Sequence, residues 1–241
     1  MGVTAPHTGR RAVARRHRAH PGHPVADNGP GGRTMTKPPQ QVNAVTPHSC
    51  VIIDYRTGRT ELRPLAGQPA SGTVVHVDAA VPTWGTTDVP ATLPGWAPVP
   101  LRWRLAALPA VLLTAATRTC GPHRGRFHRL VQLACSGRRL TPATGRQAQY
   151  AVRAIRWASR AVPARWACLE QSTSAAVLLA LAGRRAEWRH GVATDPIRLH
   201  AWLVDPHGSP VEEPSETSLY TPTYTPDGPG PALRDRRETP L

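Results

Sequence analysis

A regular pattern of apolar and polar positions first occurs in the segment CVIIDYRTGRTELRPL, residues 50–65. An apolar run meets the turn residues Thr57-Gly58 and returns as an alternating strand, which is typical of a β-hairpin. A further strand is predicted over residues 72–77. Residues 1–34 have no hydrophobic period and are expected to be disordered.

After residue 100 the apolar residues recur at helical spacing. Leucines from Leu101 onward predict a first helix, and a second helix is expected over residues 124–134. Thr141-Pro142 supplies an N-cap and a first-turn proline for a third helix. The apolar stripe of that third helix is expected to consist of Ala148, Ala151, Val152, Ile155 and Ala158.

A fourth helix is predicted from Arg165 to Leu181. Its sequence is apolar on nearly every side after Ser174, which is typical of a buried central helix. Gly183 follows it, and glycine is the residue type favoured just after a helix ends. We therefore expect this helix to form the centre of the core.

Short strands follow this helix and are predicted over residues 186–193, 197–204 and 210–213. The segment from Tyr220 onward is rich in proline and is not expected to join a core. Helices followed by a small antiparallel sheet define an α+β fold.

These elements divide the chain into five parts. We predict a disordered basic arm over residues 1–44, a small β-hairpin region over 45–78 and a Pro-rich linker over 79–100. The main α+β domain is expected over residues 101–225, and a disordered tail over 226–241.

Positive charge is concentrated in one segment. The chain has a formal net charge of +15, and residues 101–190 carry sixteen arginines against two glutamates. This segment is a candidate surface for an anionic partner, although arginines on solvated helix faces would give the same count. A nucleic-acid-binding protein is therefore an alternative, but the arginines form no recognisable docking motif. A membrane span is not expected, because the longest apolar run, residues 105–116, is too short.

Four cysteines occur without a Cys-x-x-Cys motif, and no secretory signal precedes them. Free thiols in a cytoplasmic protein are therefore expected. His190 and His200 are conceivable metal ligands, but no third ligand accompanies them, so we expect neither a metal nor another cofactor.

The predicted position of Cys168 suits a reactive thiol. Cys168 is predicted at the start of the buried helix, where the helix dipole and free backbone N–H groups lower a thiol pKa. His200 lies in a predicted strand, and Glu212 or Glu213 on the next strand could orient its ring. This order of cysteine, histidine and acid is the nucleophile, base and orienting group of a thiol hydrolase. The alternative is a buried structural cysteine on an inert scaffold.

The same region resembles the transglutaminase-like cysteine protease of lasso-peptide biosynthesis, the B protein. The resemblance covers about residues 101–225. It rests on Cys168-Leu169, Gly191-Val192, Pro196, His200-Ala201-Trp202, Gly208, Val211-Glu212-Glu213-Pro214 and Tyr220-Thr221-Pro222.

The resemblance implies an enzyme that removes the leader from a ribosomally made precursor peptide. Cys168 would attack the scissile carbonyl, His200 would transfer the proton, and Glu213 would orient the imidazole. One extra residue in the preceding glycine turn leaves Glu212 and Asp205 as rivals for the acid. The backbone N–H of Cys168 would contribute to the oxyanion hole.

The resemblance also implies partners. These are the precursor peptide, an ATP-dependent lasso cyclase and a separate leader-recognition protein. Residues 45–78 resemble the opening strands of a leader-recognition domain, and we interpret them as a vestigial copy or as a plain surface hairpin.

Overall fold

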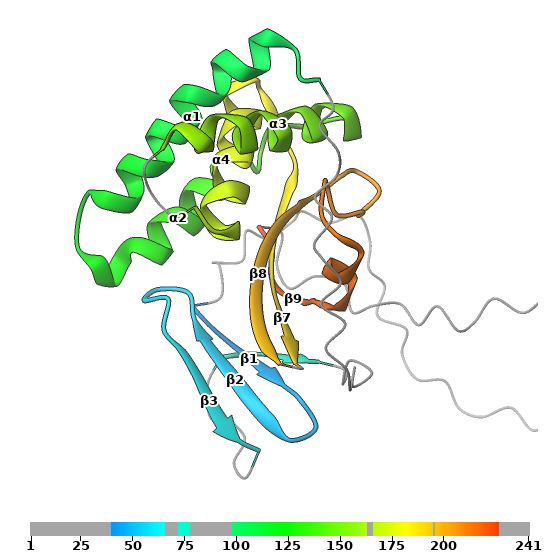
Figure 1. Ribbon diagram of the computed structural model, residues 1–241. Helices are drawn as coiled ribbons and strands as arrows, with labels where there is room; N and C mark the ends of the chain where they lie inside the picture. The colour runs from blue at the N-terminus through cyan, green and yellow to red at the C-terminus, as the bar shows by residue number, and fades with distance from the viewer. Residues whose placement is uncertain (1–39, 66–71, 78–97, 163–165, 195, 227–241) are drawn as a thin grey trace, which may run out of the picture. The chain divides into compact units, whose positions relative to one another are not determined.

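The computed structural model begins with a four-stranded sheet. It describes residues 40–65, 72–77, 98–162, 166–194 and 196–226. The strands are β1 (Gln41–Val45), β2 (Ser49–Asp54), β3 (Thr60–Pro64) and β4 (Thr73–His76), in the order β3-β2-β1-β4 (Figure 1). Strand β1 pairs antiparallel with β2 and parallel with β4, and β2 and β3 form the predicted hairpin.

Strand β1 shows that the predicted disordered arm extends too far along the chain. We expected residues 1–44 to be disordered, but Val42 and Ala44 are fully buried in β1. The short strand β1 is stabilised by pairing with β2 on one side and with β4 on the other, and these long-range contacts could not be predicted from its own sequence. Residues 1–39 of the predicted arm, 79–97 of the predicted linker and 227–241 of the predicted tail lie outside the described residues.

Within the described residues, four α-helices follow the sheet. They are α1 (Leu101–Thr119), α2 (Arg126–Ala134), α3 (Gly145–Ala158) and α4 (Cys168–Leu181), with short 3-10 turns at His123–Gly125, Ser159–Ala161 and Ser215–Leu219. The first two helices are where the apolar spacing predicted them. The predicted stripe of α3 is buried along its whole length.

The predicted start of α3 is wrong. Thr141-Pro142 forms the short strand β5, which pairs with β6 (Arg184–Arg185), and α3 begins at Gly145. The reason is a capping box in which the Thr144 hydroxyl accepts from the Gln147 N–H and the Gln147 side chain accepts from the Thr144 N–H.

Helix α4 is the buried centre of the fold, as predicted, with Ser172–Leu179 all buried. It begins at Cys168 rather than at Arg165, which lies outside the described residues, because Ala167 is extended. Gly183 follows the helix with φ 69°, a conformation that suits glycine. The late start places Cys168 in the first turn.

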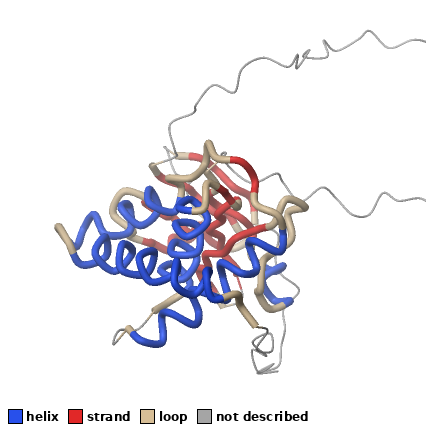
Figure 2. The backbone as a smooth tube through the Cα atoms, turned by 90° about the horizontal axis from the view of Figure 1, so that it is seen from above, coloured by secondary structure: helices blue, strands red, loops and turns tan. Residues whose placement is uncertain are grey.

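A three-stranded antiparallel sheet contains β7 (Glu187–Thr194), β8 (Ile197–Val204) and β9 (Thr221–Tyr224) in the order β8-β7-β9. The helices gather on one side of the strands (Figure 2).

Two predictions about the C-terminal part of the chain are wrong. Residues 210–213 form only an isolated bridge between Pro210 and Val204, and the proline-rich tail contributes β9, in which Tyr224 is buried. No helix in the described part of the chain is long and apolar enough to cross a membrane.

A buried polar contact joins the two larger sheets. The Tyr55 hydroxyl, just beyond β2, lies 2.7 Å from Nδ1 of His190 in β7 and 2.9 Å from the hydroxyl of Thr223 in β9. The rings of Phe127 and Tyr224 pack on the same tyrosine. We call Tyr55, His190 and Thr223 the buried link.

The hairpin turn at Gly58 yields a testable prediction. Gly58 has φ 76°, and a Cβ there would lie 2.5 Å from Cβ of Phe127. Gly58→Ala is expected to reduce the free energy of unfolding by about 2–3 kcal/mol, because it adds a clash to an unfavourable backbone conformation. Gly208→Ala is the matched control, since φ is 82° there and nothing lies within 4 Å. Urea denaturation of both variants measures the difference, and equal losses would contradict the predicted clash.

Candidate active site

The thiol of Cys168 lies at the N-terminal end of the buried helix. Cys168 is the first residue of α4 and is half-buried. The carboxylate of Glu170 fixes this first turn: Oε2 accepts from the Ala167 N–H at 3.2 Å, and Oε1 lies 2.8 Å from Arg126 and 3.4 Å from Arg118. The sequence thus places the cysteine at a helix end, and the partly buried ion pairs of Glu170 hold that end.

Strand β8 brings His200 to the same place. One face of the His200 ring stacks on Trp202, with the ring centres 5.7 Å apart, and Tyr220 lies 5.2 Å away. This is the face that strand alternation predicts for His200 and Trp202. Packing against these two rings, which also contact each other, limits the rotation of the imidazole, so its two nitrogens keep their directions.

Glu213, rather than either rival acid, contacts the histidine. Nε2 of His200 donates to Oε2 of Glu213 at 2.9 Å. Glu212 turns away and pairs with Arg153 at 2.7 Å. The Asp205 carboxylate accepts from backbone N–H groups within its own turn. Strand alternation is not what separates Glu212 from Glu213, because these residues do not form a strand and Glu212 has φ 56°.

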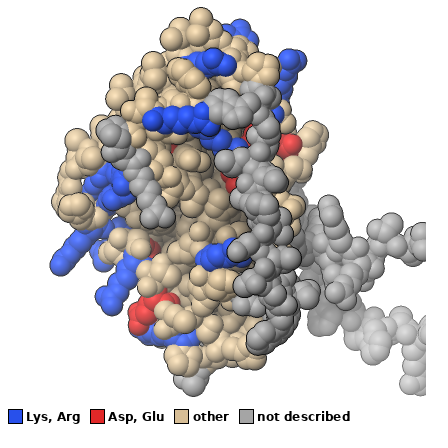
Figure 3. Space-filling view, viewed as in Figure 1, with Lys and Arg blue, Asp and Glu red and all other residues tan. Residues whose placement is uncertain are grey.

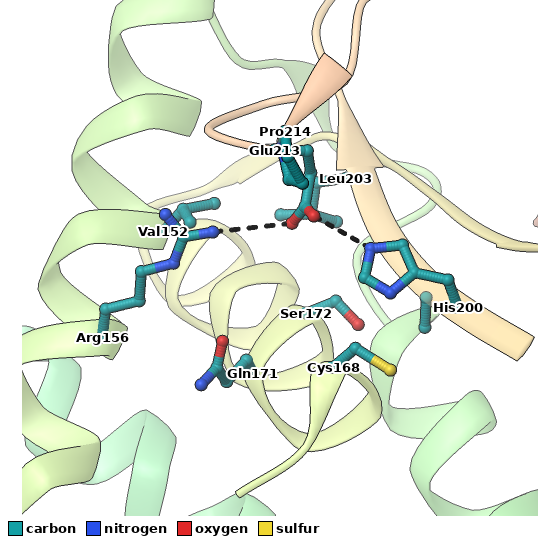
Figure 4. Close-up of a pocket in the computed structure, with 10 residues that line it drawn as sticks. Val152, Arg156, Cys168, Gln171, Ser172, His200, Leu203, Glu213 and Pro214 are labelled. Atoms are coloured by element: carbon teal, nitrogen blue, oxygen red, sulfur yellow. Dashed lines mark hydrogen bonds and ion pairs between the residues drawn. The ribbon is translucent and has the colours of Figure 1, made fainter. Parts of the chain in front are cut away.

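Cys168, His200 and Glu213 line one cavity of about 230 Å³. In Figure 4 the His200 ring lies between the sulfur and the carboxylate. The other lining residues are Val152, Arg156, Gln171, Ser172, Ala201, Leu203 and Pro214. The three residues singled out from the sequence are thus brought together, with α3, α4 and β8 forming the walls.

The charges of the site favour a thiolate and an imidazolium. Burial raises the pKa of Cys168, but the hydrogen bond with His200, the charge of that ring and backbone hydrogen bonds from Ala201 and Leu169 lower it below its usual value. Burial lowers the pKa of His200, whereas interactions with Cys168 and Glu213 raise it to about 9. An ion pair of this kind holds the sulfur in its nucleophilic form.

Arg156 is the site residue that sequence reasoning missed. It comes from α3, lines the cavity and lies 3.6 Å from Oε1 of Glu213. On the face shown in Figure 3, arginines surround the helical part and acidic side chains are few. In so arginine-rich a segment, no sequence signal distinguishes Arg156 from its neighbours.

The second histidine considered from the sequence, His190, has a different environment. It is buried in the link with Tyr55 and Thr223, and burial lowers its pKa to about 4, so the ring is neutral. Within the described ranges no group of His, Cys, Asp and Glu is arranged to hold a metal ion.

The α+β fold brings a thiol, an imidazole and a carboxylate together in one cavity, which is the set of groups that thiol-based acyl transfer uses. The family model of the transglutaminase-like superfamily matches residues 96–225, just over half of the chain. The chain therefore belongs to the transglutaminase-like superfamily. Neither a curated protein nor a solved structure matched it.

The raised pKa of His200 and the lowered pKa of Cys168 predict two different pH profiles. Alkylation of Cys168 by iodoacetamide needs only the thiolate, so its rate is expected to rise at a pH below the usual thiol value and then to stay level. Any acyl transfer by this site would also need the imidazolium as a proton donor, so its rate is expected to fall as the pH rises through about 9, the pKa of His200. In His200→Ala the midpoint of Cys168 alkylation is expected to move up, because the hydrogen bond and the charge of the ring that lower the thiol pKa are gone. Parallel profiles for the two reactions would contradict this assignment.

Proposed function

We propose that this protein is a cysteine endopeptidase that removes the leader from a ribosomally synthesised lasso precursor peptide before macrolactam closure. The observation that carries the proposal is the contact of His200 with Glu213 beside Cys168, on a domain of the transglutaminase-like superfamily. The assignment to lasso-peptide maturation rests in addition on the motifs from Cys168 to Tyr220, which resemble those of the B proteins in order and spacing.

The geometry supports the following steps. The Cys168 thiolate attacks the scissile carbonyl carbon, the C–N bond breaks, and the His200 imidazolium gives its proton to the leaving amine. A water molecule then attacks the thioester while His200 takes its proton, which releases a carboxylate and the thiol. The backbone N–H of Cys168, at the start of α4, would stabilise the oxyanion.

We further propose that Glu213 keeps the Nε2 proton of His200 in place, so that Nδ1 faces the sulfur. The proposed partners remain those of the resemblance: the precursor peptide, a separate leader-recognition protein and an ATP-dependent cyclase. The role of residues 45–78 in leader binding stays a prediction.

The test is cleavage of a precursor peptide encoded beside the gene, by the full chain together with any leader-recognition protein encoded there. We expect two products whose masses sum to that of the precursor plus one water. Protein alkylated with iodoacetamide is the control and should leave the precursor intact. An uncut precursor with all components present, or cutting by the alkylated protein, would overturn the proposal.

A further inference from the structure

Two arginines of α3 hold the loop that carries Glu213. Nη2 of Arg153 donates to Oε1 of Glu212 at 2.7 Å, and Nη2 of Arg156 donates to the backbone carbonyl of Glu212 at 2.6 Å. Arg156 also lies 3.6 Å from Oε1 of Glu213, whereas His200 contacts the other oxygen, Oε2. The Glu213 carboxylate therefore lies between a guanidinium and the imidazole (Figure 4).

The backbone at Glu212 has an uncommon conformation. With φ 56°, Glu212 is the one residue other than glycine with a positive φ in the described part of the chain. Such a conformation persists where surrounding contacts fix it, and it is concentrated at functional sites. Here it lets Glu212 face α3 while the next residue, Glu213, faces β8.

The contacts that fix this conformation are shielded from water. The side chains of Arg153 and Arg156 are 25% and 22% exposed, and those of Glu212 and Glu213 are 7% and 14% exposed. Ion pairs at this depth are screened less than surface pairs, and removing one partner leaves the other charge poorly solvated. The geometry of the loop should therefore depend on both arginines.

We infer that Arg156, assisted by Arg153, is a positioning residue that holds Glu213 against His200 and so sustains the reactive thiol of Cys168. This inference rests on the proposed thiol chemistry. Arg156 acts through Glu213 and does not itself contact the reacting atoms. In the described residues the ion pairs of Glu213 are those with Arg156 and His200.

The other groups around His200 come from different elements. Cys168 faces it from α4, and the Tyr220 and Trp202 rings pack beside it. His190 in β7 is affected by the charge of His200 and is neutral near pH 7. A change at Arg156 should thus reach the ring through Glu213.

The experiment is Arg156→Gln in the full chain, with the rate of Cys168 alkylation by iodoacetamide followed against pH. Peptide mass mapping assigns the label to Cys168, because three other free thiols are present. We expect alkylation at neutral pH to slow by about tenfold and its midpoint to rise, since an unanchored Glu213 no longer holds the ring. Arg146→Gln is the matched control, because Arg146 lies on the same helix and its guanidinium contacts Tyr150 instead.

Two further variants separate positioning from general structure. Arg156→Lys keeps the positive charge and should recover part of the alkylation rate of Cys168. If Arg156→Gln fails to fold, Arg156→Lys takes its place in the comparison with wild type. In a Glu213→Gln background, Arg156→Gln should add no further slowing, because the group through which it acts is already changed.

An unshifted midpoint and a wild-type rate in Arg156→Gln would overturn the inference while leaving the proposed function intact. Additive slowing in the double variant would overturn it as well. A wild-type Cys168 that reacts no faster than glutathione would instead overturn the proposed function.

Discussion

Cys168→Ala is expected to lower the rate of precursor cleavage by at least about a thousandfold. Alanine removes the atom that forms the thioester, so only the cavity and the oxyanion donors remain, and these alone give a small residual rate. The comparison is single-turnover cleavage of the precursor by variant and wild type, read by product mass.

The fold should survive this change, which makes the loss of activity interpretable. Cys168 is only half-buried and lies at the end of α4, whose first turn is held by Glu170. The unfolding midpoint is therefore expected to stay close to that of the wild type. Cys135→Ala is the matched control, since its sulfur lies 3.9 Å from the Tyr224 hydroxyl and outside the cavity that Cys168 lines. Cleavage by Cys168→Ala at the wild-type rate would contradict the proposed attack by the Cys168 thiolate.

Trp188→Ala is expected to produce the largest loss of stability, about 3–5 kcal/mol. Trp188 is fully buried, its ring stacks on His190 and meets the edge of Tyr224, and its indole N–H donates to the Ser172 hydroxyl at 3.0 Å. Truncation would leave a large cavity between β7 and α4. Because a domain is stable by only about 5–15 kcal/mol, a substantial part of that margin would disappear.

The measurement is chemical denaturation followed by circular dichroism. Trp157→Ala is the control, because that indole is 37% exposed on α3 and stacks with Arg104. It is expected to lose less than about 1 kcal/mol. The loss of stability in Trp188→Phe should lie between those of the two alanine variants, since phenylalanine keeps a ring but loses the donor to Ser172. Similar losses for the two alanine variants would show that Trp188 is not central to the core.

Features with a strong local pattern could be predicted from the sequence. The apolar run of α4, the alternation of β8 and the Thr57-Gly58 turn each predict their element, and Cys168 and His200 are placed by them. Strand β9 could not be predicted, because Pro222 argues against a strand. The proline is tolerated since β9 pairs on one side with β7, opposite Gly191, and lies at the edge of the described sheet.

Long-range contacts were not predictable either. Arg156 and Glu212 are 56 residues apart in the chain, and no spacing rule connects a helix face with a loop at that separation. The choice of Glu213 over Glu212 likewise depends on a left-handed backbone at Glu212. An alternating strand at these positions would also have turned one glutamate toward His200, so the pattern alone could not say which.

The buried link has a consequence for anyone who shortens this protein. Tyr55, which follows β2 directly, contacts the neutral His190 of β7, and β7 pairs with the strand that carries His200. Trimming the chain to residues 101–225 would remove the Tyr55 hydroxyl from both His190 in β7 and Thr223 in β9. The residues before α1 are therefore part of the packing of β7 and β9, and they are poor candidates for exchange with another domain.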